Sequence, residues 1–348
     1  MRSIIIAAYK DPGYIEQNVK NFRDEELIVA ADQPGPELVS IIEKYGLKAT
    51  ISTERRGKAN SLNDAVQLAT GEYLVFIDSD TRVLELGGLD GLDAADIRKE
   101  VNSSTIMEKL ANIDYFNMLI TSMLVTRLNS CLSVNGAAIC IRKDVLQELG
   151  GFRRCINEDT DLGLKLGMYG YNVGVAGRAL TKAPSSLRDW LFQRERWGLG
   201  GAQVVLENFK TITRKPKIWV PSLILLYPAL IGLMINFLLP ASIFLKLLYF
   251  ILPFMLFLPN QVVVALLLAV FEWQATKNLL TIIGPFFVWL IIMLLLSKKI
   301  DYHFKARYLP IYFFVYSPLW TAICAVSVVK VAVYKWRGKE LAVKNWPV

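Results

Sequence analysis

The chain has 348 residues, enough for one large domain or two of ordinary size, and 53% of them are hydrophobic. Its formal net charge is +8, but the basic residues flank apolar segments and form no arginine-rich tract. They therefore indicate membrane anchors and argue against a nucleic-acid partner. The single histidine, His303, excludes multi-histidine metal sites and serine–histidine triads away from it. Four cysteines without paired spacing predict reduced thiols.

The first part of the chain alternates short apolar runs with amphipathic stretches. We expect strands at residues 3–8, 26–31, 47–52 and 73–77, separated by helices at 14–22, 37–45 and 59–69. Strand and helix alternating at this spacing predicts βαβ units and a parallel sheet. No Gly-x-Gly-x-x-Gly pattern follows the first strand, so a dinucleotide-binding domain loses its main support.

Charged residues stand at the ends of these predicted strands. Asp32 ends the second strand, and Asp78 and Asp80 follow the fourth. Ligands of open α/β sheets bind at the carboxyl ends of strands, and carboxylates there suit a hard divalent cation. The turn 55–58, Arg-Arg-Gly-Lys, opens a helix whose N-terminal amides favour anions. Each feature alone is also typical of a solvated strand end or loop, but together they predict a nucleotide-diphosphate site.

Residues 81–130 are less regular. Residues 90–99 are polar, and 104–128 have helical periodicity with an apolar face that either packs in the core or rests on a membrane surface. Residues 134–141 predict another strand, in which Asn135-Gly136 allows close backbone approach. A short helix at 142–149 is expected to stop at Gly150-Gly151.

Two further clusters follow. Residues 157–161, Asn-Glu-Asp-Thr-Asp, open a predicted helix, where acids are favourable for the helix dipole alone. Gln193, Arg196 and Trp197 fall at i, i+3 and i+4 and share one helical face. An amide, a guanidinium and an indole on one face can hold a diphosphate and stack on a sugar ring, although a surface helix near a membrane would show the same pattern.

The last part of the chain predicts a membrane domain. Long uncharged stretches give about four spans, near 218–239, 241–258, 279–297 and 308–334, with 259–277 lying along the interface. We expect a cytosolic domain over 1–210 and a transmembrane domain over 211–348. The apolar run 4–9 is too short for a signal peptide, so the catalytic domain is expected in the cytoplasm. Four spans then return the basic C-terminal tail to the cytoplasm, as the positive-inside rule requires, although the basic loop 298–307 disagrees with that rule.

The order of these motifs resembles the membrane-bound inverting glycosyltransferases of family 2, the group of cellulose, chitin and hyaluronan synthases and ceramide glucosyltransferase. The resemblance covers roughly residues 1–200 and extends loosely over the predicted spans. It rests on IIIAAY at 4–9, Asp32, RRGKANSLNDA at 55–65, DSD at 78–80, GGF at 150–152, NED at 157–159 and QRERW at 193–197. It implies a GT-A-type α/β domain with a Rossmann-like mixed sheet, followed by an α-helical transmembrane domain.

On the donor side, the resemblance assigns a role to each matching residue. Tyr9 and Asp32 would contact the nucleotide base, and Lys58 would lie near the nucleotide and its phosphates. Asp78 would hold the nucleotide part of the donor, and Asp80 would ligate Mg²⁺ or Mn²⁺. Asp32 follows an alanine where many members of the group have a second acid, so this contact departs from the pattern.

On the acceptor side, the resemblance implies that Asp159 is the general base that deprotonates the acceptor hydroxyl. Gln193 and Arg196 belong to the donor side, where they would hold the diphosphate leaving group, and Trp197 would form the floor of the acceptor site. These roles agree with inversion, a single displacement that needs one base behind the acceptor and a stabilised leaving group.

We therefore expect a membrane-embedded enzyme that moves a hexose from a nucleotide-diphosphate sugar, UDP-linked, to a hydroxyl of a growing polysaccharide. The alternative is transfer of one sugar to a membrane lipid such as a polyprenyl phosphate or a glycolipid. QRERW favours the synthases, whereas four spans are few for a polymer channel and favour a lipid product or a homo-oligomer. A non-enzymatic membrane scaffold and a soluble metal-nucleotide hydrolase are the remaining alternatives.

Overall fold

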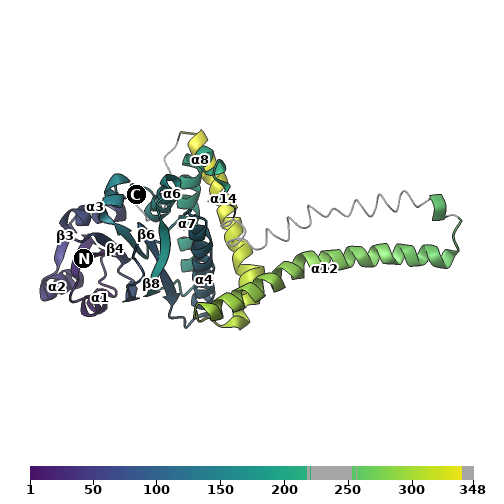
Figure 1. The fold of residues 1–348 in the computed structure, drawn as a ribbon, viewed down its shortest axis with the longest axis horizontal. Coiled ribbons are helices and arrows are strands. Elements are labelled where there is room, and N and C mark those ends of the chain that lie inside the picture. The colour runs from purple at the N-terminus through teal and green to yellow at the C-terminus, as the bar shows by residue number, and fades with distance from the viewer. Residues whose placement is uncertain (218–219, 221–252, 256, 339–348) are drawn as a thin grey trace. The chain divides into compact units, whose positions relative to one another are not determined.

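The computed structural model describes residues 1–217, 220, 253–255 and 257–338 of the chain. It divides into two compact units, which are described separately below. The first is Met1–Leu225 together with Leu319–Val348, and the second is Leu226–Pro318. The first unit therefore includes the C-terminal helix as well as the predicted catalytic part (Figure 1).

The first unit is built on one mixed sheet with the order β3-β2-β1-β4-β7-β6-β8-β5. Its strands are β1 (Arg2–Tyr9), β2 (Glu26–Asp32), β3 (Lys48–Ser52), β4 (Tyr73–Asp78), β5 (Thr81–Glu85), β6 (Ala94–Val101), β7 (Ala138–Arg142) and β8 (Val173–Thr181). The strands β3, β2, β1 and β4 run parallel, as the sequence predicts. Strand β7 is antiparallel to both β4 and β6, which makes the sheet mixed.

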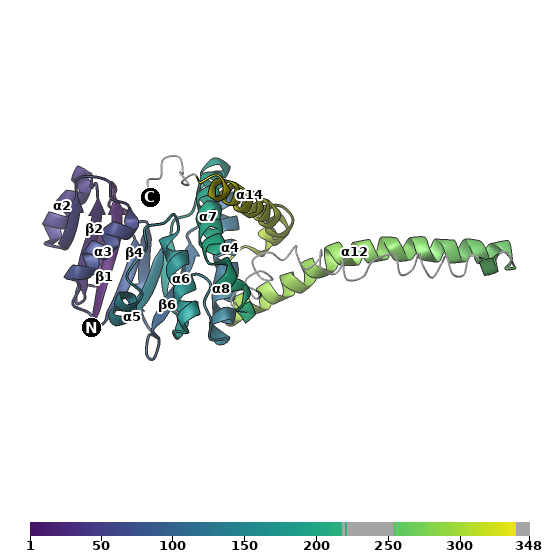
Figure 2. The same ribbon diagram turned by 90° about the horizontal axis from the view of Figure 1, so that it is seen from above.

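Helices cover both faces of this sheet (Figure 2). The helices of this unit are α1 (Ile15–Asn21), α2 (Pro36–Tyr45), α3 (Lys58–Leu68), α4 (Ile106–Arg127), α5 (Lys143–Glu148), α6 (Glu158–Tyr169), α7 (Leu187–Glu207), α8 (Phe209–Thr213) and most of α14 (Ser317–Trp336), of which α14 packs on α7. Successive residues of a strand point to opposite faces, so β1 sends Ile5 to the side of α3 and Ile4 to the side of α1 and α2.

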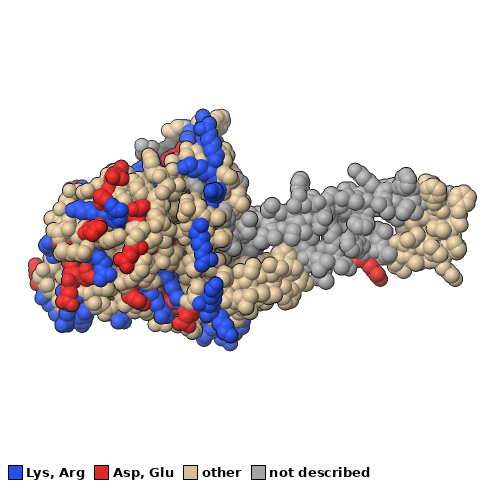
Figure 3. Space-filling view, in the orientation of Figure 1, with Lys and Arg blue, Asp and Glu red and all other residues tan. Residues whose placement is uncertain are grey.

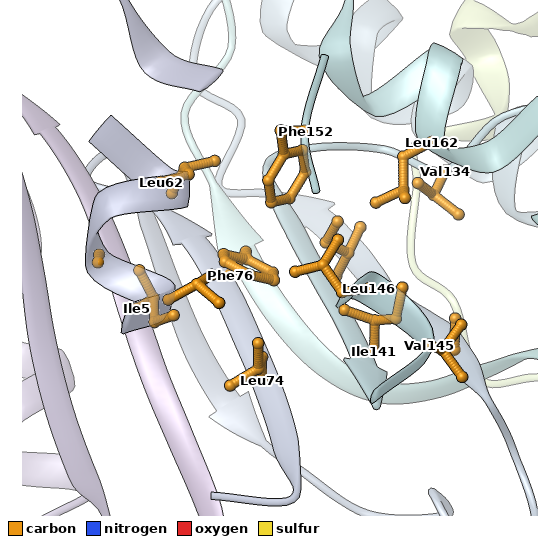
Figure 4. Packing of buried hydrophobic residues seen from close by; sticks show 14 of the residues in the cluster. Ile5, Leu62, Leu74, Phe76, Val134, Ile141, Val145, Leu146, Phe152 and Leu162 are labelled. Carbon is orange, nitrogen blue, oxygen red and sulfur yellow. The ribbon is translucent and has the colours of Figure 1, made fainter. Parts of the chain in front are cut away.

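The core on the α3 side fixes the helix that opens the predicted phosphate site. Phe76 of β4 meets Phe152 edge to face, with ring centroids 4.8 Å apart, and Leu62 of α3 packs in the same cluster (Figure 4). Asn63 of α3 accepts a hydrogen bond from the Phe152 amide at 2.9 Å and donates to its carbonyl at 2.8 Å. The GGF segment thus ties α3 to the core beside β4.

Strands β5, β6 and β8 were not expected from the sequence. Strand β6 reads as a polar segment because Asp96, Lys99 and Glu100 lie within it, yet all three are buried. Lys99 pairs with Asp96, and Arg178 of β8 pairs with Glu100 at 2.8 Å. Paired charges can be buried in a strand, so the lack of an apolar run at residues 94–101 did not exclude a strand there.

The surface of the first unit carries charges of both signs. Lysines, arginines, aspartates and glutamates are interspersed over the sheet-bearing part, at the left of Figure 3. Along the edge of this part that lies nearest the middle of the picture, lysines and arginines form a vertical stripe with few acids in it (Figure 3).

The second unit contains α12 (Asn260–Lys299), a continuous helix of 40 residues with Pro285 inside it. It runs through both the predicted interfacial segment 259–277 and the predicted span 279–297, so these two are one element. The predicted spans 218–239 and 241–258 fall largely outside the described residues. A π-helical segment follows at Tyr312–Tyr316. The ring of Tyr312 stacks on the ring of Trp289, with centroids 5.6 Å apart and an interplanar angle of 4°.

One helix in the described ranges is long and apolar enough to cross a membrane, and it spans Ala306–Trp336. It coincides with the predicted span 308–334.

Candidate active site

The centre of the candidate site is Lys58, the first residue of α3. Its Nζ lies 2.5 Å from Asp78 Oδ1 at the end of β4 and 3.3 Å from Glu158 Oε1 at the start of α6. It also donates a hydrogen bond to the Gly136 carbonyl at 3.3 Å. One ammonium group therefore joins α3, β4, α6 and the loop before β7. The sequence predicted Lys58 and Asp78 as site residues but assigned no role to Glu158.

The charges around Lys58 keep it protonated. Burial alone would lower the pKa of Lys58, but attraction by Asp78, Glu158 and Asp159 outweighs burial and raises it well above its usual range. Burial, with the repulsion of Asp159, raises the pKa of Glu158, and Lys58 opposes that rise. The lysine is thus a permanent cation in a pocket of carboxylates.

Asp159 is held by backbone amides beside this group. Its Oδ2 accepts a hydrogen bond from the Gly136 amide at 2.7 Å, and its Oδ1 accepts from the Thr160 amide at 2.7 Å. A side chain at position 136 would place its Cβ 2.7 Å from Asp159 Oδ2, so only glycine fits there. The Asn-Gly pair that the sequence marked for close backbone approach therefore orients the predicted base.

Asp80 follows Asp78 after one intervening residue, and its environment suits a cation. Burial and the negative charge of Asp78 together raise the pKa of Asp80 to about 6. Repulsion between two carboxylates is relieved by a divalent ion, and Mg²⁺ is commonly bound by one or two carboxylates plus substrate phosphates. Within the described part of the chain no group of three or more histidines, cysteines or acids forms a complete metal cage. The residues present therefore fit a metal that diphosphate oxygens help to hold.

Asp32 and Tyr9 lie on neighbouring strands and contact the basic turn before α3. Asp32 Oδ1 and Oδ2 accept hydrogen bonds from the amides of Arg56 and Gly57, each at 2.9 Å. The Arg55 guanidinium lies over the Tyr9 ring, 4.3 Å from its centroid. Asp32 therefore holds the turn that leads into Lys58, a role that the sequence did not indicate. Its contact with a nucleotide base stays a prediction.

The predicted diphosphate-binding residues Gln193 and Arg196 and the predicted acceptor-binding residue Trp197 lie on α7. Gln193, Arg196 and Trp197 are all half-buried, and the Trp197 carbonyl accepts a hydrogen bond from Asn157 Nδ2 at 3.0 Å. Asn157 immediately precedes Glu158, so α7 is linked directly to the start of α6. The structure thus brings Lys58, Asp78 and Asp159 into one group and connects that group to α7 through Asn157.

Sequence reasoning missed a buried ion pair behind α7. Arg194 Nη2 lies 2.7 Å from Asp114 Oδ2 of α4, and both side chains are almost inaccessible to solvent. Arg194 lies inside the QRERW segment but was not singled out. Tryptophans at i−4 and i+3, Trp190 and Trp197, were the available signal, because these positions share its helical face.

Fold and site together define a glycosyltransferase with a GT-A-like α/β domain. The chain belongs to a family described as Glycosyl transferase family group 2, which matches residues 73–329, and the description Glycosyl transferase family 2 matches residues 3–86.

Curated relatives carry the name poly-β-1,6-N-acetyl-D-glucosamine synthase. The one from Staphylococcus epidermidis is 24% identical over 244 residues, which are 62% of this chain and 58% of the relative. The one from Staphylococcus aureus strain MSSA476 is 25% identical over 262 residues, 67% of this chain and 61% of the relative. The matched region thus spans less than two thirds of the length of these relatives.

A solved structure shares the fold. It is a mannosyltransferase from Pyrobaculum calidifontis in complex with GDP-Man and Mn²⁺, with a TM-score of 0.53 and 18% sequence identity. The alignment covers 97% of this chain and 88% of that chain. At this identity the likeness concerns the fold.

Proposed function

We propose that this chain is a metal-dependent, inverting hexosyltransferase that transfers a sugar from a nucleotide-diphosphate donor, UDP-linked, to a hydroxyl of a growing polysaccharide. The observation that carries the proposal is the group around Lys58. A permanent cation, the carboxylates Asp78 and Asp80 and the amide-held Asp159 meet where strand β4 ends and helices α3 and α6 begin. The two strand-end carboxylates suit a cation and its diphosphate, and the third is placed to serve as a base.

Each residue has one task in the proposed reaction. Asp159 takes the proton of the acceptor hydroxyl as that oxygen attacks the anomeric carbon, and the nucleoside diphosphate leaves from the opposite face. Lys58 and Arg196 offset the negative charge that develops on the leaving phosphate, and Gln193 positions it. Mg²⁺ or Mn²⁺, held by Asp80 with Asp78 beside it, would supply further charge neutralisation to the diphosphate. No covalent intermediate on the protein is needed, because inversion takes a single displacement.

The names of the curated relatives support a polysaccharide product, since those proteins are poly-β-1,6-N-acetyl-D-glucosamine synthases. N-acetylglucosamine is therefore the first sugar to test. A lipid acceptor is the second candidate, and one observation favours it. The apolar helix that spans Ala306–Trp336 packs against α7, the helix with the predicted acceptor residue Trp197. A lipid-linked acceptor held by that helix would reach the same site.

We also propose that the enzyme works at a membrane, with the site on the cytoplasmic side. The apolar helix over Ala306–Trp336 supports one span. A multi-pass topology with four spans and a cytoplasmic C-terminus, and assembly into a homo-oligomer, remain parts of this proposal. The first two of the four predicted spans fall largely on residues outside the described ranges.

The decisive experiment is product partitioning. Membranes containing the protein are incubated with radiolabelled UDP-N-acetylglucosamine, UDP-glucose or GDP-mannose and Mn²⁺, and are then extracted with organic solvent. Label in long chains that the solvent does not dissolve is the expected result. Label in the organic phase would replace the polysaccharide acceptor with a lipid. No metal-dependent transfer from any of these donors would contradict the proposed function.

A further inference from the structure

Arg194 lies at the centre of a buried aromatic box between α4, α7 and α14. Its guanidinium carbon is 4.4 Å from the ring centroid of Trp197, 5.0 Å from that of Trp320 and 5.8 Å from that of Trp190. Only 2% of Arg194 is exposed, and its charge is balanced by Asp114 of α4. A planar guanidinium can pair with a carboxylate in its own plane while its faces stack on indole rings, which an ammonium cannot do.

Helix α14 follows α7 along this region (Figure 2). Farther along α14 than Trp320, Ser327 lies against Gly198 of α7. A Cβ added to Gly198 would be 2.6 Å from Ser327 Oγ. Lys330 then pairs with Glu195 at 3.0 Å. The last contact is apolar, because Val331 of α14 packs in a small cluster with Leu199 and Ala202 of α7. These contacts align α14 with the part of α7 that carries the QRERW segment.

Tyr115, the residue after Asp114 in α4, is also buried. Burial together with the charge of Asp80 raises the pKa of Tyr115 above its usual range. The preceding residue, Asp114, pairs with Arg194 of α7.

We propose that Arg194 is a positioning residue and that Trp320 of the apolar C-terminal helix completes its binding box, so that α14 sets the placement of Trp197 on the acceptor side. The inference rests on the proposed function, in which Trp197 forms the acceptor floor. The donor-side residues outside α7 are held by other contacts, since Lys58 joins Asp78 to Glu158. Loosening the box therefore disturbs transfer more than donor binding.

The first test replaces Trp320, which is only half-buried, so the fold should tolerate the change. In Trp320→Ala the turnover number falls about ten-fold or more, because the aromatic face that positions Arg194 is lost. The KM for UDP-N-acetylglucosamine and the Mn²⁺-dependent affinity for UDP change much less than the turnover number, because Lys58 and Asp78 keep their contacts. In Trp320→Phe most of the turnover returns, since a phenyl ring still offers a face to the guanidinium.

Trp336 provides the matched control. It lies on the same helix but is 84% exposed, so Trp336→Ala is expected to behave as the wild type. Equal turnover in Trp320→Ala and wild type, or an equal loss in the two alanine variants, would overturn the inference. So would a parallel loss of UDP binding, which would indicate general unfolding. If the wild type itself transfers no sugar, that result contradicts the proposed function and is distinct from a failure of the aromatic box.

A second variant tests the stacking separately from the charge. Arg194→Lys keeps a cation for Asp114 but removes the planar group, so turnover is expected to fall while UDP binding persists. Wild-type turnover in this variant would show that only the ion pair matters and would refute the aromatic box.

Discussion

At the residue scale, the candidate site is organised by one lysine that forms ion pairs with carboxylates from two elements. Lys58 pairs with Asp78 and Glu158, and in the proposed reaction Asp80 serves the metal and Asp159 serves the acceptor. Because Asp159 accepts two backbone hydrogen bonds, its carboxylate is fixed without a partner side chain having to move. The roles proposed for the four acids follow from this pairing, because Asp78 and Glu158 form ion pairs with Lys58.

The assignment of Asp159 as the base predicts the behaviour of Asp159→Asn. The amide has nearly the same shape but cannot take a proton, so transfer should fall by about 10²–10⁴-fold. Binding of UDP with Mn²⁺ should be unchanged. Steady-state transfer and calorimetric titration of UDP measure the two effects. Asp144→Asn, at an exposed pair with Arg142, is the control. Turnover at the wild-type level in Asp159→Asn would remove the base from this position.

The metal assignment predicts the behaviour of Asp80→Ala. Removing the carboxylate takes away the ligand that a divalent cation and a diphosphate would share, so Mn²⁺ should no longer strengthen UDP binding. Titration of UDP with and without Mn²⁺ tests this directly. The same Mn²⁺ dependence in variant and wild type would place the metal elsewhere.

At the element scale, the close contact of α6 with α7 joins the NED and QRERW segments. Gly200 lies so near Asn157 that an added Cβ would be 2.4 Å from its Cγ, whereas a Cβ at Gly201 would meet nothing within 4 Å. Asn157 also donates the hydrogen bond to the Trp197 carbonyl. The two neighbouring glycines therefore form a natural pair for testing this contact.

Gly200→Ala should displace Asn157 and lower both stability and turnover. Overpacking typically costs about 1–3 kcal/mol, while Gly201→Ala should gain up to about 1 kcal/mol from helix propensity. Chemical unfolding in detergent compares the two variants, and transfer assays follow the activity. If both variants unfold at the same denaturant concentration and turn over equally, the α6–α7 contact does not matter.

Sequence and structure agree best where local signals dominate. Strands β1, β2 and β4 were predicted close to their observed bounds because each is a short apolar run that is largely buried. Strand β3 was predicted as well, although it lies at the edge of the sheet and its residues are half-buried or exposed. Strand β6 was missed because its charges are neutralised only by partners that folding brings in, such as Arg178 of β8 for Glu100. The ion pair between Asp114 and Arg194 was not predicted for the same reason, since nothing in either segment indicates its partner. Residues within local motifs were found, including Gly136, which holds Asp159, whereas charged partners far apart in the sequence were not.

At the whole-molecule scale, the C-terminal helix α14 packs on the catalytic unit with one side and exposes apolar residues on the other. One side of α14 packs on α7 through Ser327 and Val331, both of them buried. Val326 and Val329 are exposed at 65% and 63%. A long apolar surface of this kind is costly in water and is matched by lipid. The same helix can therefore link the bilayer to the acceptor side of the site.

This arrangement predicts how the protein partitions. If the exposed valines of α14 contact lipid, the protein stays with membranes after washes with alkaline carbonate and with about 1 M salt, which shortens the Debye length to about 3 Å. Burial of apolar surface is not weakened by such screening, whereas attraction of basic residues to anionic lipid is. Sedimentation followed by immunoblotting measures the retained fraction, and a peripheral protein in the same membranes is the control. Release by salt alone would mean that charge, and not α14, holds the enzyme at the bilayer.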